Sequence, residues 1–158
     1  MQITEFDITY FHRAIVLANE AEKQNNLPIG AVITYEREIV AEGKNSIWSP
    51  KLSLTRHAEI EALGNVPEHL WGVSGKLTLY TTLEPCLMCL GAILLHQVGR
   101  VLYGSADGYG GASLVIGKMP TFFEEQMNQT EWMGPAFPDE CDQLYKRVMK
   151  LEKGHPGS

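Results

Sequence analysis

Two short stretches of the chain carry side chains that bind metal ions and move protons. Cys86 and Cys89 follow directly after Pro85 and are three residues apart. Cysteines at this spacing lie on one face of a helix, so both sulfurs can hold one ion. A helix N-terminus favours negative charge, which lowers the thiol pKa and presents both cysteines as thiolates. The second stretch contains His57 and Glu59, two residues apart.

One histidine and two cysteines form a donor set that suits zinc, with His57 as the third ligand. No fourth protein ligand stands near them in the sequence, and three protein ligands plus water is the pattern of catalytic zinc sites. Glu59 would then carry protons beside that water. Residues two apart do not face each other on a helix. His57 is therefore expected at a helix entrance, which Thr55 or Ser53 would cap.

A structural zinc site is the alternative reading of these residues. It would require a fourth ligand, either Cys141 or a further histidine, and it would leave Glu59 without a role. Cys141 is read more simply as a small apolar residue of the core. The chain contains both the His57–Glu59 pair and the Cys86–Cys89 pair, and Pro85 stands between an expected strand and an expected helix. This combination favours a catalytic zinc site.

The hydrophobic pattern indicates the elements that must position these residues. Apolar residues at helical spacing predict a first helix, and alternating runs predict a hairpin and two later strands. Strands that alternate with helices predict a sheet covered by helices on both faces. A glycine-rich segment at 107–117 reads as a loop that holds a short strand or turn. The expected elements are helices at 7–24, 55–63, 85–97, 120–128 and 138–150, and strands at 29–35, 39–43, 77–81 and 100–104.

Length and charge narrow the function. The 158 residues predict one domain over residues 1–153, followed by a disordered tail at 154–158. The formal net charge is −6, which disfavours nucleic-acid binding because phosphate contacts need a basic surface. The opening residues carry no signal peptide, and the longest apolar run, Leu87 to Leu95, is too short to span a bilayer. A cytoplasmic protein with no membrane contact is expected.

The combined pattern of H-x-E, at His57 and Glu59, and P-C-x-x-C, at Pro85 to Cys89, resembles the cytidine-deaminase superfamily. Within it, the chain is similar to the branch of bacterial tRNA adenosine deaminases, guanine deaminases and fungal cytosine deaminase, from about Pro28 to Leu114. The resemblance implies a three-layer α/β/α fold with a central mixed sheet of about five strands. It also implies one zinc per chain and the hydrolytic replacement of an exocyclic amine by oxygen, with release of ammonia. Related enzymes are commonly dimers, and the apolar Pro-Cys helix also leads us to expect a homodimer.

The resemblance assigns three substrate contacts near the first hairpin. In related enzymes an asparagine just after the second strand contacts the bound base, and Asn45 matches that position. An amide is apt because its donor and acceptor can read a base edge. Ile29 and Gly30 match positions of the pocket wall, where Gly30 would allow close approach of the backbone.

Three further contacts come from the resemblance. Backbone N–H groups around Ala58 and Cys86 would assist the reaction. Glu84 would contribute backbone contacts, although its carboxylate also suits a helix N-terminus. The C-terminal segment commonly closes over the base or helps to select it, so Trp132 is a candidate wall residue. Its alternative role is to complete the core.

Three functions remain open at this point. The first is deamination of a small nucleobase or nucleoside. Two features favour it: the net charge of the chain is negative, and acidic residues alternate with the basic residues near the C-terminus. The second is deamination of adenosine in tRNA, because Leu83 to Ala92 looks closest to that group. The third is a non-catalytic binding subunit with a structural zinc, which the presence of Glu59 opposes. We expect a free base or nucleoside.

Overall fold

The computed structural model describes residues 2–155 of the chain. The strands are β1 (Gly30–Tyr35), β2 (Glu38–Lys44), β3 (Thr78–Leu83), β4 (Arg100–Ser105) and β5 (Glu131–Met133). The helices are α1 (Glu5–Lys23), α2 (Ala58–Gly64), α3 (Leu87–Leu95), α4 (Thr121–Met127) and α5 (Pro138–Gly154), with 3-10 turns η1 (Glu68–Lys76) and η2 (Ala112–Val115). No helix among the described residues is long and apolar enough to cross a membrane.

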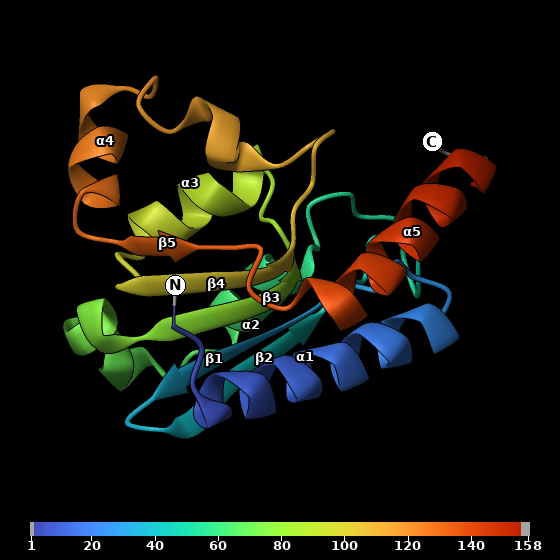
Figure 1. Cartoon of the computed structure of the whole chain (residues 1–158), viewed down its shortest axis with the longest axis horizontal. Coiled ribbons are helices and arrows are strands. Elements are labelled where there is room, and N and C mark those ends of the chain that lie inside the picture. The colour runs from blue at the N-terminus through green and yellow to red at the C-terminus, as the bar shows by residue number, and fades with distance from the viewer. Residues whose placement is uncertain (1, 156–158) are drawn as a thin grey trace.

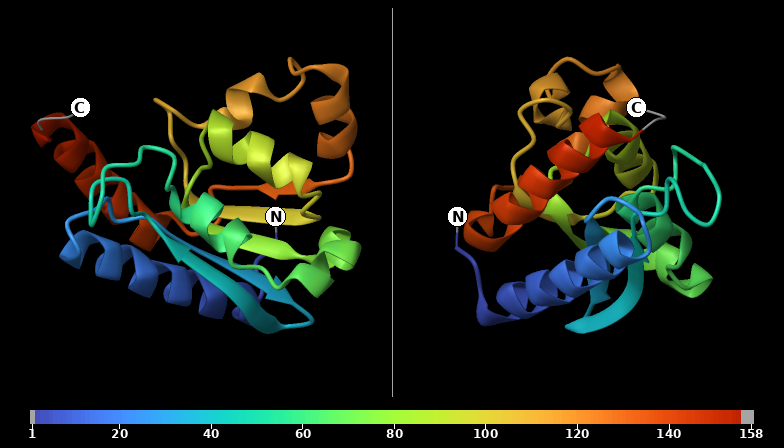
Figure 2. Two further views of the ribbon diagram at one scale, coloured as in Figure 1. Left: turned by 180° about the vertical axis from the view of Figure 1, so that it is seen from behind. Right: turned by 90° about the vertical axis from the view of Figure 1, so that its right-hand side faces the viewer.

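The five strands form one mixed sheet in the order β2-β1-β3-β4-β5 (Figure 1). β1 pairs antiparallel with β2 and β3, whereas β3, β4 and β5 run parallel. Helices cover both faces, as Figure 2 shows from two further sides. The predicted three-layer α/β/α fold with a mixed sheet of about five strands is therefore confirmed.

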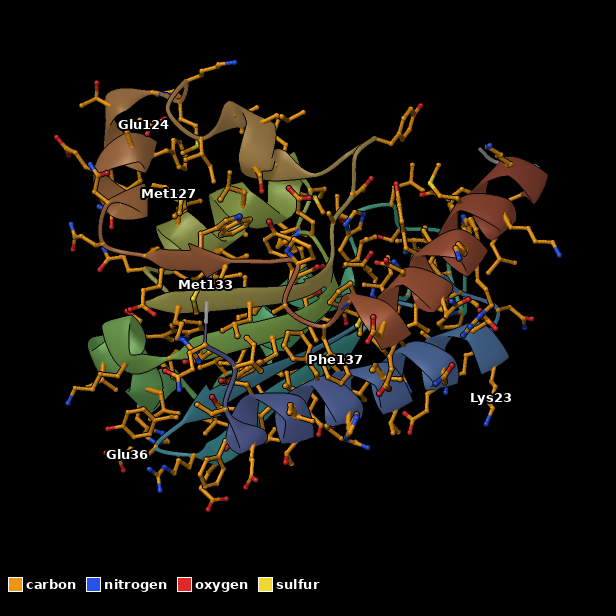
Figure 3. All side chains as sticks on the ribbon, viewed as in Figure 1. Lys23, Glu36, Glu124, Met127, Met133 and Phe137 are labelled. Atoms are coloured by element: carbon orange, nitrogen blue, oxygen red, sulfur yellow. The ribbon has the colours of Figure 1, made fainter. Side chains whose placement is uncertain are left out.

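One face of the sheet is covered by α1 and α5. A capping box begins α1, since Thr4 and Asp7 exchange hydrogen bonds between side chain and backbone. Gly30 of β1 packs directly on this helix, where a Cβ would collide with backbone atoms of Ala14 and Ala18. Phe137, labelled in Figure 3 where the chain enters α5, stacks on Phe11 of α1 at 5.4 Å between ring centroids.

The opposite face is covered by α2 and α3. Buried apolar residues of alternating strand positions, including Ile33, Leu79 and Val101, join residues of these two helices in one core cluster. α4 adds an outer layer, because Met127 packs with the buried residues of α3 in a separate small cluster (Figure 3). The two helices that follow the motif stretches are thus held by the central sheet.

The C-terminal third differs from the sequence expectation. Residues 107–117 contain a turn, as one of the two expected alternatives, in the form of the 3-10 turn η2. The fifth strand, which was not expected, is β5, just before Gly134-Pro135. The three residues of β5 are too few to show an alternation of apolar and polar side chains. β5 is recognised only by its main-chain pairing with β4. α5 continues to Gly154, and the ring of His155 stacks on Trp48 at 3.8 Å. Residues 156–158 of the expected tail lie outside the described residues.

Candidate active site

Four chain segments converge at one end of the sheet. The parallel strands β3 and β4 end there, and antiparallel pairing brings the start of β1 and the end of β2 to the same edge. Residues that directly precede or follow these strands are therefore neighbours: Ile29 before β1, Asn45 after β2, Glu84 after β3 and Asp107 soon after β4. In mixed α/β sheets this edge is where ligands bind.

The three predicted metal ligands come together at this edge. His57 Nδ1 lies 3.5 Å from Cys86 Sγ and 3.6 Å from Cys89 Sγ, and the three donor atoms lie within 4.8 Å of one another. Tetrahedral zinc with ordinary Zn–N and Zn–S bonds places nitrogen and sulfur ligands about 3.6 Å apart. The donor set and its spacing therefore fit one zinc ion per chain.

Two of these ligands occupy N-cap positions. His57 precedes α2 and Cys86 precedes α3, and among the described residues neither side chain caps its helix. Thr55 and Ser53 do not cap α2, contrary to the expectation from the sequence. α3 begins at Leu87, so Pro85 lies before the helix and not at its first position. Two positive helix ends therefore point at the cluster, which favours thiolates there.

The charge state of the cluster follows from these contacts. A hydrogen bond from Cys89 lowers the pKa of Cys86, burial opposes this, and His57 adds a second lowering contact, so the pKa falls to about 4. The pKa of Cys89 is raised, because its thiol donates the hydrogen bond to Cys86 and because it is buried. Contact with Cys86 raises the pKa of His57. A divalent cation would compensate the negative charge that the second thiolate brings.

Glu59 lies beside the cluster on the first turn of α2 and is 3% exposed. Its Oε1 accepts a 2.7 Å hydrogen bond from Thr81 Oγ1, and its Oε2 lies 3.5 Å from Cys89 Sγ. Burial raises the pKa of this carboxyl, which favours its protonated form. Thr81 fixes one oxygen, so the other is the atom that can exchange a proton.

Asn45 is 1% exposed and has an unusual set of hydrogen bonds. Its Oδ1 accepts from the backbone N–H groups of Leu27 and Ile47 at 3.3 and 3.4 Å. These bonds fix the orientation of the amide. Its Nδ2 is buried and has no partner among the described residues. A buried donor without an acceptor is costly, so this group is suited to a ligand.

Glu84 holds the loop that forms one side of the site. Its Oε2 accepts from Asp107 N and its Oε1 from Ser113 N, both at 2.9 Å. Gly111 lies so close to this carboxylate that a Cβ there would collide with it. The carboxylate therefore anchors the glycine-rich loop, whose fold no local pattern in the sequence specifies.

A cavity of about 230 Å³ opens between these elements. Of the sequence-predicted site residues, it is lined by Ile29, Asn45, His57, Glu59, Glu84 and Cys86, and Cys89 lies beneath with no exposed surface. The remaining lining residues are Leu27, Ile47, Leu83, Asp107, Tyr109, Gly110, Tyr145, Val148, Met149 and Glu152.

Three predicted contacts lie away from this lining. Gly30 faces α1, and Ala58 is fully buried at the start of α2. Trp132 lies on β5, where its Nε1 donates to Ser113 Oγ at 3.1 Å. It packs among residues that flank α3 and α4, so it completes the core.

The resemblance led us to expect that the C-terminal segment borders the site, but it named none of the residues of α5 and of the 106–111 loop that line the cavity. Tyr145 of α5 donates a 2.7 Å hydrogen bond to Asp107 Oδ1, joining these two segments over the cavity. Their residues are far apart in the chain and share no motif. Thr81 was also missed, although a polar residue on the apolar face of a strand that precedes the cysteines was a usable signal.

Comparisons with known proteins agree with this geometry. The family model for the cytidine and deoxycytidylate deaminase zinc-binding region matches residues 4–105. A tRNA-specific adenosine deaminase of Bacillus subtilis is 37% identical over 138 residues, which cover 85% of this chain and 83% of the relative. The corresponding protein of Haemophilus influenzae is 38% identical over 144 residues, or 89% and 81% of the two chains.

Solved structures resemble the chain as well. One, from a study of A-to-I editing by tRNA:A34 deaminases at the wobble position of transfer RNA, has 31% identity and a TM-score of 0.63. The aligned region covers 72% of this chain and 90% of the chain in that structure. A guanine deaminase from Nitrosomonas europaea, at 17% identity, shares the fold with a TM-score of 0.69 over 94% and 87% of the two chains. With its His/Cys/Cys cluster and buried glutamate, the chain belongs to the cytidine and deoxycytidylate deaminase family and is a zinc-dependent hydrolytic deaminase.

Proposed function

We propose that this deaminase acts on a small nucleobase or nucleoside. The observation that carries the proposal is the lining of the cavity. It contains the carboxyl groups of Glu59, Glu84, Asp107 and Glu152 and, among the described residues, no lysine or arginine. Its volume of about 230 Å³ is below the range of drug-sized ligand pockets and suits one flat ring system. An RNA substrate would bring phosphates toward these carboxylates.

We assign the following roles. His57, Cys86 and Cys89 would hold the zinc, which when bound lowers the pKa of water from about 15.7 to near 7. Glu59 would take a proton from the attacking water at Oε2 and deliver it to a ring nitrogen of the base. It would then take the second proton of the same water oxygen and deliver it to the amine, which leaves as ammonia. Water supplies the oxygen, so the amine carbon ends as a carbonyl.

The base is proposed to be held by groups around the cavity. The Nδ2 of Asn45 would donate to a ring acceptor, Ile29 would pack on the ring face, and Glu84 would act through the loop that it anchors. Ala58, at the N-terminus of α2, would contribute through its backbone. A single domain over residues 1–153 and a cytoplasmic location, where thiols stay reduced, complete this proposal.

Ammonia release from a panel of substrates tests the proposal. Free bases, their nucleosides and a tRNA anticodon stem-loop would be compared with zinc-loaded protein at 50 and 200 mM salt, on the order of the range that reveals phosphate contacts. We expect turnover of at least one base or nucleoside, with little dependence on salt. Turnover of the RNA alone would reject the proposal.

Deamination of adenosine in tRNA is the second candidate. The 37% and 38% identity to tRNA-specific adenosine deaminases favours it. If it is correct, inosine will form in the RNA and the rate will fall steeply as salt rises, because bound phosphates release counterions. The same panel therefore separates the two candidates.

We also propose that the chain forms a homodimer through α3. Leu87, Met88, Gly91 and Leu95 lie on one side of this helix, and the three larger side chains are 62%, 36% and 60% exposed. The opposite side of the helix faces the core. An apolar surface of this kind is normally covered, and a second copy would bury both patches in a symmetric interface.

A further inference from the structure

The polar groups of the cavity differ between its floor and its mouth. The floor holds the buried side chains of Asn45 and Glu59, with Asn45 Nδ2 as an unpartnered donor among the described residues. The mouth is formed by more exposed residues, of which Tyr109 is 85% exposed. When the amine of a nucleobase reaches Glu59 at the floor, the far side of the ring, which carries the sugar in a nucleoside, must therefore lie at the mouth.

Two acidic residues of the lining are partly exposed, Asp107 from the loop after β4 and Glu152 from α5. The Oδ1 of Asp107 accepts from Tyr109 N, Gly110 N and Tyr145 Oη at 2.7 to 3.0 Å. These three bonds hold the carboxylate in place while its Oδ2 is not engaged by them. Burial raises the pKa of Glu152, the charge of Asp107 adds to this increase, and His57 opposes it.

We propose that Asp107 and Glu152 act as a charge filter that admits uncharged nucleobases or nucleosides and rejects their phosphorylated forms. Carboxylate oxygens accept hydrogen bonds from a ring N–H or a sugar hydroxyl. They repel a phosphate, which carries negative charge and offers acceptor oxygens of its own. Within the described part of the chain the lining itself contains no lysine or arginine, and Lys153 lines the adjoining cavity that shares Tyr109 and Glu152. The inference rests on the proposed small-molecule function.

The expected discrimination is large enough to measure. Like charges several ångström apart at a partly exposed site repel with an energy worth on the order of a tenfold change in affinity per carboxylate. Two carboxylates would therefore separate a nucleoside from its 5′-monophosphate by about a hundredfold. Because salt screens the interaction, the separation should shrink as ionic strength rises.

The test uses Asp107→Asn, Glu152→Gln and the double variant in the full chain. Each replacement removes one negative charge and keeps a side chain of the same shape, and the amide oxygen of Asn can still accept from the loop N–H groups. Glu125→Gln is the matched control, because Glu125 is exposed on α4, away from the cavity. Adenosine, guanosine and cytidine are compared with their 5′-monophosphates by kcat/KM and by calorimetric Kd.

We expect wild-type protein and Glu125→Gln to prefer the nucleoside about a hundredfold. Each single variant should reduce the ratio about tenfold, and the double variant should nearly abolish it. Equal affinity of wild-type protein for nucleoside and monophosphate would overturn the filter, as would an unchanged ratio in the double variant. Deamination of RNA alone would reject the small-molecule function, whereas the Kd ratio still decides the filter.

Discussion

The buried carboxyl of Glu59 combines two properties that a proton carrier needs. It is shielded from water at 3% exposure, and burial raises its pKa. Thr81 binds one oxygen at 2.7 Å and thereby fixes the direction of the other. A carboxyl whose pKa is raised holds a proton more readily than an exposed one, as a group that accepts a proton and passes it on requires.

Glu59→Gln should therefore remove nearly all turnover without loss of the fold. The amide still accepts from Thr81, but it cannot shuttle protons, so kcat should fall by about 10² to 10⁴. Metal analysis should still find one zinc per chain, because His57, Cys86 and Cys89 are untouched. The control is Glu61→Gln on the same helix, where the carboxylate pairs with Arg56 at 3.0 Å. Activity of Glu59→Gln near that of Glu61→Gln would rule out this role.

At the scale of single residues, the sequence predicted the metal cluster, and the proton-carrying role of Glu59 and the substrate contacts stay predictions. His57, Glu59 and the two cysteines have distinctive chemistry at fixed spacing. Gly30 and Trp132 carried no such chemistry, and both turned out to pack within the fold. The orphan amide of Asn45 is visible only once its two backbone partners are placed.

Among the elements, the loop at 106–113 depends on one side chain. Glu84 accepts two backbone hydrogen bonds that define the path of the loop, and Tyr145 of α5 binds the same loop through Asp107. Among the glycines that make the loop hard to predict, Gly111 is required by its close approach to Glu84. The loop and α5 thus form one wall that no periodic pattern in the sequence reveals.

Glu84→Gln should loosen this loop. The amide nitrogen cannot accept, so one of the N–H groups of Asp107 or Ser113 loses its partner at a cost of about 1–3 kcal/mol. Hydrogen–deuterium exchange should become faster at residues 107–113 and stay unchanged in α1. Glu68→Gln, at an exposed position of η1, is the control. Unaltered exchange in the loop would contradict the anchoring role.

For the whole molecule, a polar cluster lies at the opposite end of the sheet from the catalytic cavity. Asp7 at the start of α1 accepts from Tyr80 Oη at 2.6 Å and from Arg100 Nη1 at 2.9 Å. Burial raises the pKa of Asp7, but hydrogen bonds from Arg100, Tyr80 and Thr4 outweigh it and lower the pKa to about 2. The cluster joins α1 to β3 and β4.

Asp7→Asn should make the protein less stable at neutral pH by about 2 kcal/mol. Because the folded pKa lies below the unfolded value of 3.8, the ionised group stabilises the fold above that value. This contribution is lost as pH falls from about 4 toward about 2, so the difference between wild type and variant should shrink there. Urea unfolding at several pH values measures it, with Glu5→Gln as the exposed control. A difference independent of pH would contradict the assignment.

Assembly is the other property of the whole molecule that can be tested. Leu95→Lys places a charge on the exposed side of α3 and should convert the proposed dimer to monomer in analytical ultracentrifugation. Val16→Lys, at a 45% exposed position on α1, should leave the mass unchanged. A monomeric wild-type protein at micromolar concentration would remove the proposal.

Because His57 and Cys86 stand at the N-caps of α2 and α3, each helix begins with a side chain assigned to the ion and not to its own backbone. A bound ion then links two neighbouring helices on the same face of the sheet, and its binding energy adds to the folding energy. The supply of zinc in the cell would accordingly set how much of the newly made chain survives proteolysis. Zinc starvation would thus lower the abundance of this enzyme before it lowers the activity of each remaining molecule.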